Sequence, residues 1–297
     1  MQTFIVTGSD GYLGRRVLTQ LKGLGHDAMG VDIQNSDMNC DLSKNFEFPG
    51  SRFDRKPYLI HLASQFPGTS RGQNLLGVTK AISRNLLEES NNFSGAVVVS
   101  STAVLRRNLG SDGPVVEPWE AYGQAKLEME EDFLGSNISL QIIRPGTILG
   151  PERRGGIVEL LKRAARGKLV ILPSGGQVTQ PFVHVNDVIR AICQGAVQAD
   201  SRNGQSVTTL VASNPLTISQ AIETWTGSAP KVVPLPLAAF KLTGSDSFPI
   251  LGISKWHAGA LLYDFPGFEK SGNQSKISML DTIGSVIGFG GTLQQFD

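Results

Sequence analysis

Apolar and polar positions follow two different periods along the first half of the chain. Short, almost wholly apolar runs predict strands, and between them apolar residues recur every three or four positions, as on one face of a helix. The predicted strands cover residues 3–6, 27–33, 58–63, 96–100 and 138–144. The predicted helices cover residues 12–24, 74–90 and 119–135. This alternation predicts an α/β fold with a doubly wound parallel sheet, which binds ligands at the carboxyl ends of its strands.

The pattern loosens after residue 145. A strand is predicted at 169–172, and helices are predicted at 156–167, 187–199 and 217–227. Residues 228–275 are dense in proline, glycine and aromatic residues and have no clear periodicity. We expect the main domain to comprise residues 1–145 plus about 178–215. We expect a smaller, mixed carboxyl-terminal lobe, which binds substrate, to comprise about 146–177 and 216–297.

Composition narrows the class of protein. The 297 residues suffice for one sizeable α/β core and a smaller lobe, and 40% hydrophobic with 18% charged residues is typical of a soluble globular protein. A net charge of +1 gives no electrostatic reason to expect nucleic acid or an anionic membrane as a partner. No apolar run approaches the ~20 residues that span a bilayer.

The chain has two cysteines and four histidines. Cys40 and Cys193 cannot form a disulfide framework and lack metal-ligand spacing, and the four histidines are scattered, so we expect no metal site. Because the first predicted strand begins at residue 3, we expect no signal peptide and a cytoplasmic location.

A glycine-rich turn follows the first predicted strand. Gly8, Gly11 and Gly14 are spaced G-x-x-G-x-x-G, and a helical pattern begins directly after them. Strand, glycine turn and helix together bind a dinucleotide pyrophosphate, because the backbone can approach the phosphates and the helix presents free N–H groups. Glycines also end strands for purely structural reasons, so the position of the turn between strand and helix carries the prediction.

An acidic residue ends the second predicted strand. Asp32 lies 18 residues after Gly14, about where a carboxylate binds the ribose hydroxyls of the adenosine half of a dinucleotide. Its charge repels a 2′-phosphate, and Ile33 and Gln34 supply no compensating arginine, which favours NAD over NADP. The alternative is a strand-end aspartate that only makes a local turn. Asp41, in the loop that follows, could reach the adenine.

Two further segments carry candidate chemistry. Tyr122 and Lys126 are four residues apart on a predicted helix, so the ammonium lies beside the phenol and lowers its pKa. Such a phenol can exchange a proton with an alcohol oxygen while hydride leaves or joins the carbon. By itself this spacing occurs by chance on many helices. The strand at 96–100 runs into further hydroxyl residues, Ser101 and Thr102, at the edge where such sheets bind ligands.

In order and spacing these segments resemble the extended short-chain dehydrogenases/reductases, the NAD-dependent epimerase/dehydratase group, over about residues 1–220. The resembling pieces are Thr7–Gly14, Asp32, Asp41-Leu42, His61-Leu62-Ala63, Asn85–Glu88, Val99–Ser101, Tyr122–Lys126 with Glu130, Arg144-Pro145, Gly150-Pro151 and Phe182–Val188. The resemblance implies a Rossmann sheet, bound NAD and a homodimer formed through the helices at about 74–90 and 119–135. Beyond residue 228 it is faint.

The resemblance also implies roles for single residues. Tyr122 is the proton-transfer residue, and Lys126 binds the nicotinamide ribose. Ser101 is the catalytic hydroxyl, with Thr102 as the alternative if the register shifts by one. The residues expected at the cofactor are Gly8, Asp10, Gly11, Tyr12, Leu13, Gly14, Asp32, Asp41, Leu42, Leu62, Ala63, Tyr122, Lys126 and Pro145. Those expected at the substrate are Ser101, Thr102 and Thr147.

Departures from the family pattern limit the substrate. Dehydratases of the family carry an Asp-Glu pair where this chain has Thr102-Ala103, which disfavours dehydration. Thr147 replaces an asparagine of many nucleotide-sugar members, and Gln180-Pro181 replaces an Arg-Asp pair that helps to hold diphosphate.

We therefore expect an NAD-dependent oxidoreductase or epimerase of a secondary alcohol or ketone, with a nucleotide sugar as substrate. One alternative is an NAD(P)-dependent dehydrogenase or ketoreductase of a non-sugar small molecule. The other is a non-catalytic dinucleotide-binding regulator.

Overall fold

Two compact units make up the chain in the computed structural model. The first comprises Met1–Arg106, Val116–Pro145 and Val188–Thr209, and the second comprises Arg107–Val115, Gly146–Asp187 and Leu210–Asp297. The structure describes residues 1–44, 48, 52–65, 74–105, 121–153, 156–177, 179–198, 204–211, 216–235, 247–248, 253–254 and 276–287. Most of the stretch 228–275, where we found no periodicity, lies outside these residues.

A seven-stranded sheet forms the centre of the first unit, in the order β10-β6-β5-β4-β1-β2-β3. From β6 to β3 all neighbouring strands are parallel. The strands are β1 (Thr3–Thr7), β2 (Asp27–Asp32), β3 (Met38–Asn39), β4 (Tyr58–His61), β5 (Gly95–Val99), β6 (Leu140–Pro145) and β10 (Gln205–Leu210). Every residue of β4 and β5 is buried, as expected for central strands covered on both faces. The predicted doubly wound sheet is confirmed.

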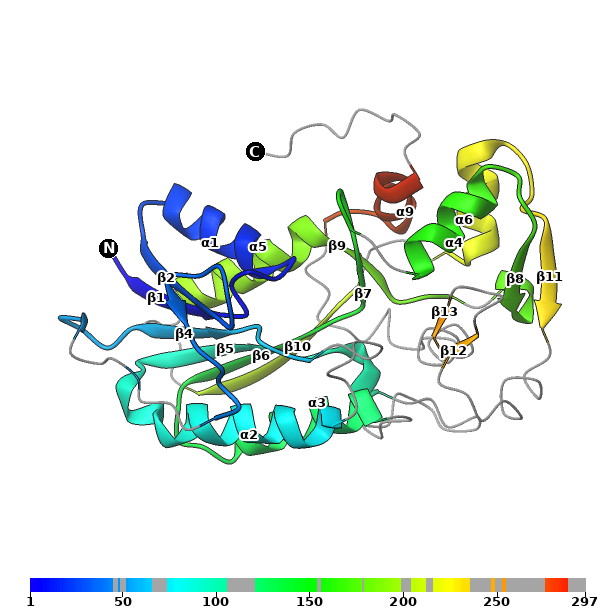
Figure 1. Ribbon diagram of the computed structural model, residues 1–297. Coiled ribbons are helices and arrows are strands. Elements are labelled where there is room, and N and C mark those ends of the chain that lie inside the picture. Colours follow the sequence, from blue (N-terminus) through cyan, green and yellow to red (C-terminus); the bar gives the residue numbers. More distant parts are fainter. Residues whose placement is uncertain are drawn as a thin grey trace. The chain divides into compact units, whose positions relative to one another are not determined.

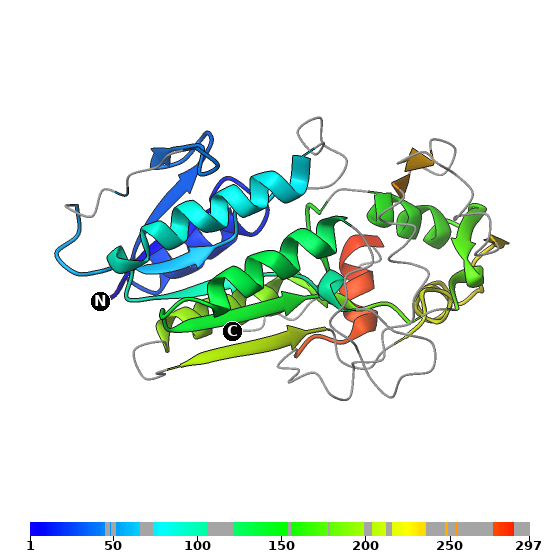
Figure 2. The same cartoon turned by 90° about the horizontal axis from the view of Figure 1, so that it is seen from below.

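Helices cover both faces of this sheet. In Figure 1, α1 and α5 lie on one face, and α2 and α3 lie on the other, where they pack against each other. Figure 2 looks onto the face that carries α2, in cyan, and α3, in green. The helices are α1 (Gly14–Gly23), α2 (Leu75–Glu88), α3 (Ala121–Leu134) and α5 (Val185–Val197), with short 3-10 helices η3 (Ser90–Asn92) and η4 (Thr102–Val104).

The direction in which the sheet grows reverses between β1 and β4. From β1 the chain adds β2 and β3 on one side, and it then returns to add β4, β5 and β6 on the other. Thr7 at the end of β1 pairs with His61 at the end of β4. Ligands of doubly wound sheets bind at such a switch point, just beyond the carboxyl ends of the strands.

The second unit mixes helices with small sheets. Its elements are β7 (Thr147–Leu149), α4 (Gly156–Ala165), β8 (Val170–Pro173), η5 (Ser174–Gly176), β9 (Phe182–His184), α6 (Ile218–Thr226), β11 (Val232–Leu235), β12 (Ser247–Phe248), β13 (Ile253–Ser254) and α9 (Met279–Ile287). Strands β7 and β9 pair in parallel, as do β8 and β11, whereas β12 and β13 are antiparallel. Helices α4, α6 and α9 pack around a core that includes Leu161, Phe182, Ile222 and Ile283.

Local sequence explains the ends of α6. Thr217 and Gln220 form a capping box, in which each side chain accepts a hydrogen bond from the backbone N–H of the other. Gly227 ends the helix with φ of 71°, a left-handed conformation that glycine adopts without strain. Among the described helices, none is both long and apolar enough to cross a membrane.

A buried carboxylate ties α9 into the second unit. The Oδ2 atom of Asp187, whose residue is 2% exposed, accepts hydrogen bonds from the backbone N–H groups of Lys276 at 3.1 Å and Ile277 at 2.9 Å. These residues directly precede α9. Asp187 therefore joins two segments of the unit that are about 90 residues apart in the chain.

We expect Asp187→Ala to lower the free energy of unfolding by about 1–3 kcal/mol, because it leaves the backbone N–H of the buried Ile277 and that of Lys276 without their acceptor. Asp187→Asn retains one carbonyl oxygen and is expected to lose less. Urea unfolding followed by circular dichroism measures both variants. An unchanged unfolding midpoint for Asp187→Ala would contradict this role.

Candidate active site

The glycine turn lies at the switch point of the first unit. The backbone N–H groups of Gly8 and Ser9 donate to the carbonyl of Val31, at 2.9 and 3.4 Å. Gly8 has φ of 70°, and a Cβ atom there would lie 2.7 Å from the backbone nitrogen of Ala63. The turn and the segment after β4 are therefore in backbone contact, and a residue larger than glycine does not fit between them.

Gly14 packs the start of α1 onto the turn. A Cβ atom at this position would lie 2.2 Å from the carbonyl oxygen of Gly8, so the helix can begin here only with glycine. At Gly11 the corresponding distance to Gly8 is 3.1 Å, which is tight but not prohibitive. Helix α1 begins at Gly14 and not at residue 12 as predicted, because the preceding residues belong to the turn.

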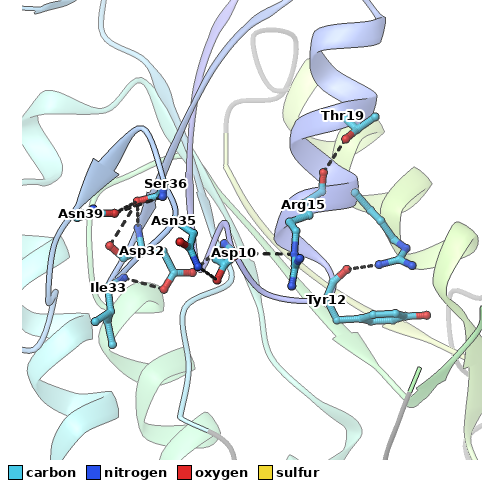
Figure 3. A network of polar contacts seen from close by, with 10 residues as sticks. Asp10, Tyr12, Arg15, Thr19, Asp32, Ile33, Asn35, Ser36 and Asn39 are labelled. Atoms are coloured by element: carbon cyan, nitrogen blue, oxygen red, sulfur yellow. Dashed lines mark hydrogen bonds and ion pairs between the residues drawn. The ribbon is translucent and has the colours of Figure 1, made fainter. Parts of the chain in front are cut away.

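Asp32 and Asp10 meet at the edge of this turn (Figure 3). The Oδ2 atom of Asp32 accepts a hydrogen bond from the backbone N–H of Asp10 at 2.9 Å, and its Oδ1 atom accepts one from Ile33 at 2.7 Å. The Asp10 carboxylate accepts a hydrogen bond from Asn35 Nδ2 at 3.2 Å and lies 3.7 Å from Arg15 Nε. Asp32 thus makes a local turn contact, through Ile33, as in the alternative given above. It also contacts the glycine turn, through Asp10.

The loop of Asp41 and Leu42 is held by a residue of α2. Asn85, which is 4% exposed, donates from Nδ2 to the carbonyls of Leu42 at 2.9 Å and Lys44 at 2.6 Å. The Asp41 carboxylate accepts hydrogen bonds from the Oγ and backbone N–H of Ser43, which lower its pKa. In the sequence, Asn85 stands out only as part of a motif; an asparagine on an apolar helix face is the signal for its role.

Thr7 and His61 form the floor between β1 and β4. The Oγ1 atom of Thr7 lies 2.8 Å from His61 Nδ1, 3.2 Å from the backbone nitrogen of Leu62 and 3.3 Å from that of Ala63. The hydroxyl accepts from these amides and lies within hydrogen-bond distance of Nδ1. The hydroxyl of Thr7 therefore positions the two residues, Leu62 and Ala63, that were predicted to line the cofactor.

His61 is held neutral in this position. Its ring is 1% exposed and stacks on Phe133 with centroids 5.8 Å apart. Burial, and then the positive charge of Lys126, lower its pKa to about 3. A proton on His61 would place a second cation in the same buried region.

Tyr122 and Lys126 lie on consecutive turns of α3, and both are buried. The Lys126 Nζ atom donates to the carbonyl of Val99, the last residue of β5, at 3.0 Å. Burial lowers the pKa of Lys126 to about 8, although the nearby Glu130 carboxylate raises it. The ammonium is therefore charged at neutral pH, and its contact with Val99 joins α3 to the carboxyl end of β5.

Glu130 is itself fully buried and paired. Arg144 of β6 donates from Nε to both carboxylate oxygens, at 2.9 and 3.1 Å, and from Nη2 to Oε2. This forked ion pair attaches α3 to β6 one helical turn beyond Lys126. In the sequence, Glu130 and Arg144 belong to two separate motifs, and nothing there indicates that they pair.

Ser101 and Thr102 lie where β5 passes into η4, which packs against α3. Ser101 Oγ accepts a hydrogen bond from the backbone N–H of Ala103 at 3.1 Å, so its hydroxyl proton can be donated elsewhere. Ser101 is half-buried, whereas Thr102 is 9% exposed. Both hydroxyls are thus at the same sheet edge as Lys126.

Thr147 lies in the second unit. Its backbone N–H donates to the carbonyl of Pro181 at 2.7 Å, and a Cβ atom at Gly146 would lie 1.7 Å from that same oxygen. Gln180, 2% exposed, precedes this contact. Pro145, the last residue of β6, belongs to the first unit and is buried. Within the described residues, no group of three His, Cys, Asp or Glu side chains could hold a metal ion.

A family model and several known proteins match this chain. The model of the NAD dependent epimerase/dehydratase family matches residues 4–208. An uncharacterised protein of Sinorhizobium fredii (strain NBRC 101917 / NGR234) is 27% identical over 212 residues, which are 64% of this chain and 52% of that protein. The matched region thus spans about half the length of this relative.

Two further proteins are similar. The N-acetyl-alpha-D-glucosaminyl-diphospho-ditrans,octacis-undecaprenol 4-epimerase of Escherichia coli O157:H7 is 29% identical over 119 residues, 37% of this chain and 36% of that protein. The structure of UDP-glucuronic acid 4-epimerase from Bacillus cereus, in complex with UDP-glucuronic acid and NAD, is 20% identical. Its TM-score is 0.65 over 97% of this chain and 98% of that one, a likeness of fold.

We expect the stability of the first unit to depend on the neutral form of His61. The folded chain keeps the imidazole unprotonated down to about pH 3, whereas the unfolded chain binds a proton near pH 6.5. Stability is therefore lost as the pH falls from 6.5, by up to ~1.4 kcal/mol per pH unit. His61→Asn keeps an acceptor for Thr7 and removes the titration, so its unfolding free energy is expected to fall less steeply. Urea unfolding at pH 6.5 and about pH 5 compares the slopes, and equal slopes would contradict the assignment.

Proposed function

Because the chain belongs to the NAD dependent epimerase/dehydratase family, we propose that it binds NAD and interconverts a secondary alcohol and a ketone. The observation that carries the proposal is the joining of α3 to the end of β5. There, Lys126 contacts Val99, Tyr122 precedes Lys126 by one turn, and Ser101 is the second residue after the strand. These are the three groups that the reaction requires, and all three belong to one unit.

The switch point fits a dinucleotide. Gly8 and Gly14 leave no room for a Cβ atom, so backbone lines the turn where the pyrophosphate would lie, and the amino terminus of α1 faces an anion there with its positive dipole end. Asp32 would bind the ribose hydroxyls of the adenosine half, and the Asp41–Leu42 loop would lie by the adenine. Leu62 and Ala63, positioned by Thr7, would line the cofactor.

The proton transfer is assigned to Tyr122. When bound, NAD accepts a hydride from the substrate carbon and can return it. As hydride leaves, the phenolate oxygen of Tyr122 takes the proton of the substrate hydroxyl, and it gives the proton back when the ketone is reduced. The Lys126 ammonium favours the phenolate electrostatically and retains an N–H group for the nicotinamide ribose, because the Val99 carbonyl and the Met129 sulfur take two of its three. Ser101 donates its hydroxyl proton to the substrate oxygen.

A nucleotide-linked sugar is the proposed substrate, and epimerisation is the proposed reaction. Support comes from the Escherichia coli relative, a 4-epimerase of a sugar linked through diphosphate to undecaprenol, because a nucleotide sugar carries the same sugar–diphosphate group. A ketoreductase of a non-sugar compound is the second candidate, favoured by Gln180-Pro181 in place of the family's diphosphate-binding pair.

We further propose a homodimer through α2 and α3, on whose surface Lys80, Arg84, Glu88 and Asp132 line an open groove.

A turnover screen separates these candidates. Native mass spectrometry of the purified protein would identify retained NAD or nucleotide sugar. Assays with nucleotide sugars and with simple ketones would follow. Retained NAD with no net redox change in the products supports epimerisation, whereas net oxidation of the nicotinamide supports the reductase.

We expect Tyr122→Phe to lower kcat by about 10²–10⁴-fold, because the proton-transfer group is lost while the ring remains. The Kd for NAD, measured by calorimetry, is expected to stay within about twofold of wild type. Gln124→Ala, an exposed position on the same helix, serves as the control and should keep full activity. Full activity in Tyr122→Phe would refute the mechanism.

Ser101→Ala and Thr102→Val separate the two candidate hydroxyls. Since Ser101 is the more accessible and has a free proton, we expect Ser101→Ala to lower kcat by about 10²-fold or more. Thr102→Val should retain most of the activity. Steady-state kinetics of both variants decides the assignment, and the reverse outcome would transfer the role to Thr102.

A further inference from the structure

A second carboxylate accompanies Asp32 at the edge of the glycine turn. The backbone N–H of Asp10 donates to Asp32 Oδ2 at 2.9 Å, so the two residues are adjacent although they are 22 positions apart in the chain. The side chain of Asp10 is only 23% exposed. Two negative charges therefore gather at the end of β2, where the ribose of the adenosine half would bind (Figure 3).

The Asp10 carboxylate is held in this place from two sides. Asn35 Nδ2 donates to its Oδ2 atom at 3.2 Å, and Arg15 Nε lies 3.7 Å from its Oδ1 atom. Asn35 has φ of 52°, a left-handed conformation that asparagine tolerates better than most residues. The loop after β2 thus turns an amide toward the carboxylate on the glycine turn.

Arg15 is the basic side chain that pairs with Asp10 in this arrangement. No arginine directly follows Asp32 in the sequence, but the fold brings Arg15, in the first turn of α1, to the same edge through Asp10. The other described cations of α1 have separate contacts. Arg16 donates to the carbonyl of Tyr12 at 3.0 Å, and Lys22 lies 3.9 Å from Asp37 at the far end of the helix.

We propose that Asp10 is a second determinant of cofactor specificity: its carboxylate adds to the charge of Asp32 and keeps Arg15 in an ion pair, so that a ribose 2′-phosphate is repelled. A 2′-phosphate carries negative charge and needs a cation, whereas a vicinal diol needs acceptors such as Asp32. With Asp10, Asp32 and Arg15 present, the edge has a net charge of −1. Removing the Asp10 charge makes it neutral and releases Arg15.

The side chain of Asp10 can be changed without disturbing the turn. Its backbone N–H, and not its carboxylate, makes the contact with Asp32. Asp10→Asn keeps the shape of the side chain and still offers an oxygen to Asn35. Discrimination between cofactors can therefore be measured separately from the integrity of the turn.

Isothermal titration calorimetry of NAD⁺ and NADP⁺ tests the proposal on the purified chain, independently of any turnover. Asp10→Asn is expected to raise the affinity for NADP⁺ relative to that for NAD⁺ about tenfold, the effect of one charge-assisted contact. The double variant Asp10→Asn with Arg15→Gln is expected to lose most of that gain. Circular dichroism and thermal melting verify that each variant is folded.

Asp37→Asn is the matched control. It removes a carboxylate from the same loop, but the Asp37 side chain contacts the backbone N–H of Gly30 and the ammonium of Lys22 instead of Asp10 or Arg15. Its ratio of NADP⁺ to NAD⁺ affinity should equal that of wild type. Because the discrimination is electrostatic, the wild-type ratio should also weaken as salt is added.

Several results would overturn the proposal. These are an unchanged affinity ratio in Asp10→Asn, an equal change for both cofactors, an equal gain in Asp37→Asn, or a gain that persists without Arg15. The proposal rests on the dinucleotide cofactor proposed above, and the two fail differently. If wild type binds neither nucleotide, the proposed function is wrong, whereas tight NAD⁺ binding with an unaltered ratio refutes only the role of Asp10.

Discussion

The first unit depends on one close approach of two backbones at the switch point of its sheet. Gly8, at the end of β1, lies against the backbone of Leu62 and Ala63, just beyond β4, where any side chain on Gly8 would overlap them. The hydroxyl of Thr7 lies within hydrogen-bond distance of both amides. Because these segments touch, the glycine turn and the segment after β4 form a single surface of backbone on which a dinucleotide can lie. Asp10 and Asp32 are brought together by the same turn.

The buried charges beneath α3 are arranged around one carboxylate. Glu130 lies between Lys126, on its own helix, and Arg144 of the sheet, and it is fully buried. Removing a charge from water is costly unless it is paired, so this grouping requires all three residues together. His61 contributes no charge, because burial and Lys126 keep it neutral. The result is a helix whose Tyr122 and Lys126 are attached to β5 and β6 by polar contacts as well as by packing.

The alternation of apolar strands and amphipathic helices could be predicted for those elements of the first unit that have one environment throughout. Its two edge strands were not predicted, because β3 has only two residues and β10 passes from exposed to buried along its length. The elements that were not predicted lack this property. Strands β7 and β9 have only three residues each, too few to show a period. Helix α9, MLDTIGSVI, has nine residues, and three of them, Met279, Ile283 and Val286, are buried in the core with α4 and α6. Its attachment depends on Asp187, about 90 residues away.

The sequence by itself determined the doubly wound sheet and the glycine turn, because each depends on local periodicity or on short spacing along one element. The candidate residues Tyr122, Lys126 and Ser101 came from the resemblance of the ordered motifs to the family, and Asp32 from its position after the glycine turn. Only the tertiary structure decided which residues from different elements share a site. The pairing of Thr7 with His61, the clamp of Asn85 on the Asp41 loop and the contact of Arg15 with Asp10 arise this way. Such contacts follow from strand order and from backbone hydrogen bonds between segments far apart in the chain, and no local pattern of residues records them.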